Sequence, residues 1–187
     1  MKKFQLFIAL MLFMALNAQA QNESNGNTST KFGLKGGFAS LALKVDVEGT
    51  NVNEDVSGFY LGGFAEFYLS DNFNLLPELT YARFTEDGES SDVLLIPVLL
   101  KYKPNERFGL LAGPQFDYLL NEEDSEGLKR LGFGLAVGAS YDITDNVIID
   151  ARYSFGLSDR IDDLGDFDGF DVKAKLNYFQ IGLGYRF

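Results

Sequence analysis

Charged side chains recur at alternate positions of segments that are otherwise apolar or rich in glycine. A charge that faces a crowded interior is costly unless an opposite charge pairs with it. These acids and bases therefore predict a set of buried salt bridges, although the same groups along a wide channel would conduct ions or protons. We favour the salt-bridged interior. The predicted polar network consists of Lys35, Glu66, Glu78, Lys101, Gln115, Asp117, Asp150, Arg152 and Arg186.

Aspartate is concentrated in the segment 158–171. Carboxylate oxygens are the ligands that Ca²⁺ and Mg²⁺ prefer. The candidates for a cation site are Asp162, Asp163, Asp166 and Asp168, although their spacing departs from that of an EF-hand loop. A run of charge is more often a solvated surface. Weak divalent bridging to anionic lipopolysaccharide is a less specific alternative.

Composition excludes several classes of active protein. The chain of 187 residues has no Cys or His, and its 16 Lys and Arg against 27 Asp and Glu give a net charge of −11. Without Cys there is no disulfide or thiolate site, and without His the usual general base is missing. No Gly-x-Ser-x-Gly or Walker motif occurs, and the acidic balance argues against nucleic acid. The sequence predicts neither an enzyme nor a cofactor.

The elements that must position the charged residues are predicted to be strands. Alternation dominates after Lys31, and each segment has about ten residues or more, enough to cross a bilayer, whereas strands of soluble domains average about 5–6. Short turns alternate with longer connections, which predicts an all-β fold, an eight-stranded antiparallel up-and-down transmembrane β-barrel. The predicted strands are 31–47, 57–70, 73–85, 92–103, 108–120, 129–142, 146–157 and 172–187.

The longer connections are polar and hold most of the acidic residues. They should therefore form one strongly negative rim outside the cell. These predicted extracellular loops are 48–56, 86–91, 121–128 and 158–171.

One face of each strand is bulky and apolar, and the other is small or charged. In 129–142, Phe133 and Leu135 alternate with Gly132 and Gly134. A face of glycine, alanine and serine suits the inside of a narrow barrel, whereas lipid solvates the bulky face. An eight-stranded barrel is just wide enough for side chains to fill, which favours a plugged interior. Tyrosines near strand ends predict interfacial girdles; they are Tyr68, Tyr81, Tyr102, Tyr118, Tyr141 and Tyr185.

The N-terminus reads as a secretory leader. Basic residues precede an apolar run that is too short for a spanning helix, and Ala-Gln-Ala follows at 18–20. We therefore predict a signal peptide over 1–20 and a disordered segment over 21–30, leaving the barrel domain at 31–187. Export by this peptide predicts localisation in the cell outer membrane.

The ordered set of short motifs resembles the small outer-membrane β-barrel proteins of Bacteroidetes, labelled porin-family or PorT-like, of the OmpA/OmpX barrel type. The motifs are FGLKGG (32–37), GGFAEF (62–67), PELTY (77–81), IPVLLKY (96–102) and IGLGYRF (181–187). The resemblance covers residues 31–187 and implies an outer-membrane location without a uniform activity. The end of the chain, with Tyr185 and Phe187, looks like the signal read by the barrel-assembly machinery, a partner during biogenesis.

Three functions of different class follow from this interpretation. We favour a non-enzymatic structural or interaction protein of the envelope, whose acidic loops meet outer-membrane lipid, lipopolysaccharide, ions or other partners. The alternative is a small gated cation-selective pore or conduit. A soluble lipocalin-like binder would need an apolar lumen, which the polar inward residues argue against.

Overall fold

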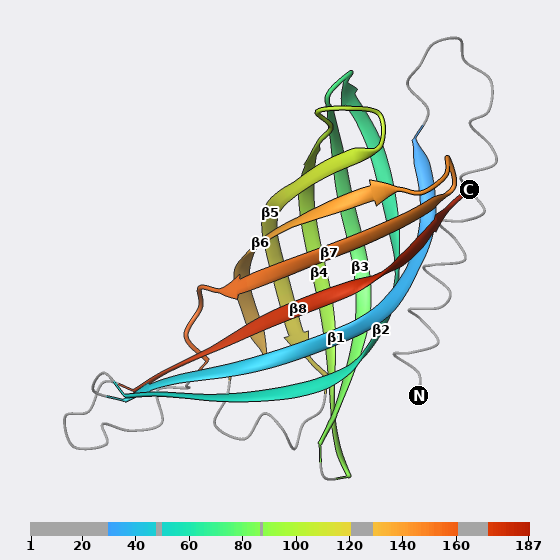
Figure 1. Cartoon of the computed structure of the whole chain (residues 1–187). Helices are drawn as coiled ribbons and strands as arrows, with labels where there is room; N and C mark the ends of the chain where they lie inside the picture. The colour runs from blue at the N-terminus through green and yellow to red at the C-terminus, as the bar shows by residue number, and fades with distance from the viewer. Residues whose placement is uncertain (1–29, 48–49, 87, 121–128, 161–171) are drawn as a thin grey trace.

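The structure is a computed structural model that describes residues 30–47, 50–86, 88–120, 129–160 and 172–187. Its strands form one closed antiparallel barrel in sequence order (Figure 1). No helix in these ranges is long and apolar enough to span a membrane. The strands are β1 (Lys31–Val47), β2 (Thr50–Ser70), β3 (Phe73–Glu86), β4 (Glu89–Tyr102), β5 (Phe108–Leu119), β6 (Leu131–Asp142), β7 (Val147–Gly156) and β8 (Val172–Arg186).

The first and last strands close the barrel. β1 pairs with β8 from Gly33 opposite Arg186 to Val47 opposite Val172. Closure satisfies the backbone hydrogen bonds at both edges, which a strand structure in lipid requires. The predicted eight-stranded up-and-down barrel is confirmed.

The barrel has two different ends. The turn end carries the short connections β2–β3, β4–β5 and β6–β7 together with the start of β1 and the end of β8. The loop end carries the connections that follow β1, β3, β5 and β7. Of the four loop-end connections, only those after β5 and β7 are long, so the predicted alternation of short and long connections is confirmed in part.

Two of the predicted loops are wrong. β2 begins at Thr50 rather than after a loop over 48–56, and its ladder with β1 continues to Val47 opposite Thr50. β4 likewise begins at Glu89, and Glu86 pairs with Glu89 where a loop over 86–91 was predicted. In the first segment, Val52 and Val56 continue the alternation of apolar and polar residues. The second segment has no apolar residue, and its ladder continues through backbone pairing beside a 3.3 Å hydrogen bond between the Thr85 and Ser90 hydroxyls. In Figure 1 these two hairpins project in different directions at the loop end.

The two faces of the wall follow the sequence pattern. Along β6, Gly132, Gly134 and Ala136 are buried, whereas Phe133 and Leu135 are exposed. The barrel is thus inverted relative to a soluble protein, with its large apolar residues on the outside.

Candidate functional site: the barrel interior

A ring of four charges occupies the lumen at the turn end, and we call it the turn-end quartet. Its members, Glu66, Lys101, Asp142 and Arg186, come from β2, β4, β6 and β8, and all are buried. Lys101 Nζ lies 3.3 Å from Glu66 Oε1 and 3.6 Å from Asp142 Oδ1. Arg186 Nη2 lies 3.0 Å from Glu66 Oε2 and 3.3 Å from Asp142 Oδ1. Each base therefore contacts both acids.

A second ring, the middle quartet, comes from odd-numbered strands. Lys35 of β1 lies 3.2 Å from Glu78 Oε1 of β3 and 2.8 Å from Asp150 Oδ2 of β7. Arg152 Nη2 of β7 completes the ring, at 2.6 Å from Glu78 Oε2 and 3.2 Å from Asp150 Oδ2. Inward residues of alternate strands thus form successive layers, as barrel geometry favours.

A small cavity separates the two quartets. Its volume is about 20 Å³, and members of both quartets line it together with Ser140. This is room for about one water molecule. Ser140 Oγ is buried there and makes no hydrogen bond within the described residues. The geometry suits one ordered water rather than a continuous channel.

A third polar group, the loop-end cap, closes the lumen near the loop end. Arg160, which follows β7, forms an ion pair with Asp117 of β5, and Tyr178 Oη of β8 donates a hydrogen bond of 3.0 Å to Asp117 Oδ2. Arg160 also donates to the carbonyl of Lys129 at 2.9 Å. Its guanidinium occupies the space that a side chain at Gly132 would need. Arg160 thus ties two connections to the lumen.

The lumen between the middle quartet and the loop end is mainly apolar. Buried aliphatic and aromatic side chains pack together there, and Phe84, Val93 and Leu95 have no exposed surface. The prediction of a polar interior was therefore too broad, because it was built on the charged positions alone. The remaining members of this cluster are Ala39, Leu41, Tyr60, Ala82, Leu119, Leu176 and Tyr178.

The structure places all nine residues of the predicted polar network in the lumen, each at most 6% exposed. Gln115 lies apart from the quartets and accepts a 2.8 Å hydrogen bond from Ser154 Oγ. Sequence reasoning missed Asp142 and Arg160. Alternation could have identified Asp142, because this residue continues the inward positions of β6. Alternation could not have identified Arg160, because this residue lies beyond the end of β7.

The candidate cation ligands Asp162, Asp163, Asp166 and Asp168 lie outside the described residues, as do the predicted signal peptide and residues 21–29. Within the described ranges, no group of three or more acidic, His or Cys side chains is placed to hold a metal ion.

Aromatic side chains band the outer wall near both ends. At the turn end, the rings of Phe73 and Tyr102 lie 5.1 Å apart and those of Tyr185 and Phe187 lie 5.6 Å apart. Nearer the loop end, Phe116 and Phe133 lie 5.3 Å apart. The predicted tyrosine girdles therefore include many phenylalanines. Tyr68 instead directs its hydroxyl to the β2–β3 turn, where it donates a 2.6 Å hydrogen bond to Asp71 Oδ1.

This wall, apolar outside and charged within, has the architecture of a membrane barrel, and comparison with known proteins agrees. A family model described as "Outer membrane protein beta-barrel domain" matches residues 6–187. The chain belongs to this family. The predicted outer-membrane localisation is thus confirmed. Since the long loops of such barrels lie outside the cell, the loop end, which carries the long connections after β5 and β7, is extracellular and the turn end is periplasmic.

Individual relatives are more distant. The outer membrane protein PagN of Salmonella typhimurium is 31% identical over 77 residues, which cover 36% of this barrel's chain and 32% of PagN. The alignment thus spans about a third of that relative. The structure of Ail from Yersinia pestis is 15% identical, covers 84% of this chain and 99% of its own, and has a TM-score of 0.47. The structure of OprG from Pseudomonas aeruginosa is 17% identical, covers 87% of this chain and 98% of its own, and has a TM-score of 0.46.

Proposed function

We propose that this outer-membrane barrel is a non-enzymatic structural and interaction protein of the envelope, with a closed, salt-bridged interior. The observation that carries this proposal is the pair of stacked quartets. Their acids and bases are directed at one another, and each acid contacts two bases. Charges that conduct an ion need access to water, whereas these are almost completely buried.

The extracellular end supplies the interaction surface in this proposal. Asp55, Glu86 and Glu89 lie on the extended hairpins and are exposed, and more acids follow in the connections after β5 and β7. Such a rim suits divalent cations that bridge to lipopolysaccharide, or basic partners outside the cell. The assignment to the PorT-like barrels of Bacteroidetes rests on the short motifs and is part of the same proposal.

Single-channel recording in a planar bilayer tests the closed interior. The protein is purified from outer membranes and recorded with and without millimolar Ca²⁺. We expect no conductance steps in either condition. Stable cation-selective steps would overturn the proposal and support the alternative of a gated pore.

Silence counts as closure only when the protein is inserted, which is verified by recovering folded barrel from the same bilayer-forming vesicles. Folding is verified by the different mobilities of unheated and boiled protein on a denaturing gel.

A further inference from the structure

Two lysines face each other on the outer wall near the extracellular end. Lys44 of β1 is the direct cross-strand partner of Lys175 of β8, and both side chains are exposed. Directly opposed residues of an antiparallel pair have Cβ atoms about 5 Å apart, and like charges at this spacing destabilise the sheet. This pair therefore calls for an anion.

No described carboxylate neutralises the pair. Within the described ranges, neither lysine forms an ion pair. Two acids lie near the pair in register: Asp46, two residues beyond Lys44 on β1 and opposite Lys173, and Asp55, opposite Ala42 on the neighbouring strand. Asp55 makes no ion pair within 4 Å among the described residues. On this face of β8, β1 and β2, the register places three lysines (Lys44, Lys173 and Lys175) against two acids (Asp46 and Asp55), an excess of one positive charge.

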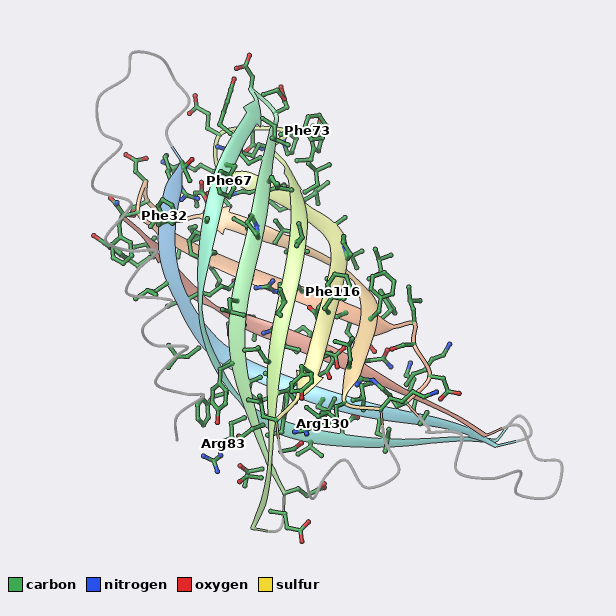
Figure 2. The ribbon with its side chains drawn as sticks, turned by 180° about the vertical axis from the view of Figure 1, so that it is seen from behind. Phe32, Phe67, Phe73, Arg83, Phe116 and Arg130 are labelled. Atoms are coloured by element: carbon green, nitrogen blue, oxygen red, sulfur yellow. The ribbon has the colours of Figure 1, made fainter. Side chains whose placement is uncertain are left out.

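The arginines on the opposite wall have partners in the protein. Arg83 Nε lies 3.6 Å from Asp92 Oδ1. Arg130 lies over the Tyr118 ring at 5.2 Å and donates to the Leu120 carbonyl at 3.0 Å. Figure 2 shows both arginines near the extracellular end, far from Phe67 and Phe73. Substitution of Arg83 and Arg130 removes the same charge as substitution of the two lysines, so these arginines are matched controls.

The lysine pair lies just beyond the lipid-facing band. The exposed positions of β8 are apolar from Phe187 to Phe179. Asn177 is buried and accepts a hydrogen bond from the Gly156 N–H, so Lys175 is the next exposed residue. Twelve residues of a tilted strand rise about 30 Å, whereas the apolar band of such barrels is about 25 Å tall. Lys44 and Lys175 therefore lie at the level of the outer-leaflet headgroups.

The wall beneath the lysines suits a glycolipid. β1 and β2 present small residues there, with Ser40 opposite Ser57. Phe38, Phe59 and Phe179 follow toward the membrane centre, and all are exposed on the lipid side. A sugar headgroup fits over the small residues, and acyl chains pack against the rings.

We propose that Lys44 and Lys175 bind the phosphate of a phosphorylated glycolipid of the lipid A type in the outer leaflet. Each lysine near a membrane surface adds attraction for an anionic headgroup, and the phosphate relieves the repulsion between them. This site rests on the lipopolysaccharide partner of the proposed function. It does not depend on whether the lumen conducts.

Native mass spectrometry of the purified protein in detergent with added diphosphoryl lipid A tests this site. We expect Lys44→Gln with Lys175→Gln to weaken binding at least about tenfold. The variant Lys44→Arg with Lys175→Arg, and the control Arg83→Gln with Arg130→Gln, should each stay within about threefold of wild type. Equal affinity of the glutamine variant and the wild type would overturn the proposal.

Comparison of lipid A, dephosphorylated lipid A and inorganic phosphate shows which part of the ligand the site binds. Wild-type protein should bind dephosphorylated lipid A at least about tenfold more weakly, and the glutamine variant should no longer distinguish the two lipids. Inorganic phosphate at millimolar concentration should not displace lipid A. Displacement would overturn the lipid as occupant, since the site would then be a simple anion site. Conductance steps from the wild type would refute the closed lumen but would leave the lipid site untouched.

Discussion

Lys101 and Arg186 share the same two carboxylates in the turn-end quartet. Each lies within 3.6 Å of both Glu66 and Asp142, and Lys101 is only 2% exposed. Loss of one base therefore leaves two buried acids competing for the other base. A buried charge without its partner costs far more than the intact pair contributes.

We expect Lys101→Met to lower the free energy of unfolding by about 3 kcal/mol. Methionine fills most of the volume of the lysine, so the change reports mainly the lost charge. The measurement is urea unfolding in lipid vesicles, followed by the gel mobility of unheated samples.

Lys31→Met is the control for this change. Lys31 is exposed at the start of β1, and a surface substitution there should change stability by less than about 0.5 kcal/mol. If Lys101→Met costs no more than Lys31→Met, Lys101 faces water or a wide channel and the quartet is refuted.

The loop-end cap predicts strong coupling between Asp117 and Arg160. Asp117→Asn alone leaves a buried guanidinium without its acid, and Arg160→Met alone leaves the acid with only the Tyr178 hydroxyl. The double variant removes both charges, so its cost should be about 2 kcal/mol less than the sum of the single costs. Urea unfolding of the four proteins of this cycle gives the coupling energy.

Arg83 and Asp92 provide the matched cycle on the outer wall. Their side chains are 45% and 22% exposed, and such surface pairs couple by less than about 1 kcal/mol. Coupling of Asp117 and Arg160 that is no larger than this would contradict a desolvated ion pair in the cap.

Gly132 is predicted to be required for the position of Arg160. A Cβ atom at residue 132 would overlap the guanidinium of Arg160, so Gly132→Ala should cost about 2 kcal/mol through overpacking. In an Arg160→Ala background the same change should cost little. Thermal unfolding, read from gel mobility, compares the two backgrounds.

Gly184→Ala is the matched inward substitution. A Cβ atom at Gly184 would meet its nearest neighbour at 3.5 Å, an ordinary contact. We expect a change of less than about 0.5 kcal/mol there. Equal costs at Gly132 and Gly184 would mean that Arg160 does not occupy the space beside Gly132.

The sequence predicts the barrel wall better than the contents of its lumen. Alternation assigns a face to most strand residues, because a shift by one residue would move the whole apolar set to the other side; the exceptions include the register shift near Tyr68 and the buried Asn177. Lys35, Glu78 and Asp150 could therefore be placed in the lumen without coordinates. Which charges meet depends on strand tilt and stagger, which no local pattern specifies.

A balanced charge count hid a fifth inward acid and a fifth inward base. Four inward acids matched four inward bases, so nothing in the sequence required Asp142 or Arg160. Arg160 follows β7 outside any alternation, and only the closed fold brings it to Asp117. The apolar lumen near Phe84 was missed for a related reason, because an inward apolar residue is less conspicuous in a sequence than an inward charge.

Phe187, which directly follows β8, is predicted to matter for assembly more than for stability. Phe187 is 70% exposed, and its backbone nitrogen donates a 2.8 Å hydrogen bond to the Phe32 carbonyl, a bond that any residue at this position retains. Its ring lies beside Tyr185 on the lipid side of β8. An apolar strand end of this kind can be recognised by strand addition before the barrel closes.

We expect Phe187→Ser to reduce the amount of folded barrel in the outer membrane several-fold while leaving the refolding yield in detergent nearly unchanged. The measurement compares the gel-shifted band from cell envelopes with that from refolded protein. Phe32→Ser, at the same end of the barrel but on β1, is the control, and it should reduce both amounts equally or neither. If the two substitutions reduce assembly in cells to the same extent, the effect arises from the aromatic girdle and not from a signal at the end of β8.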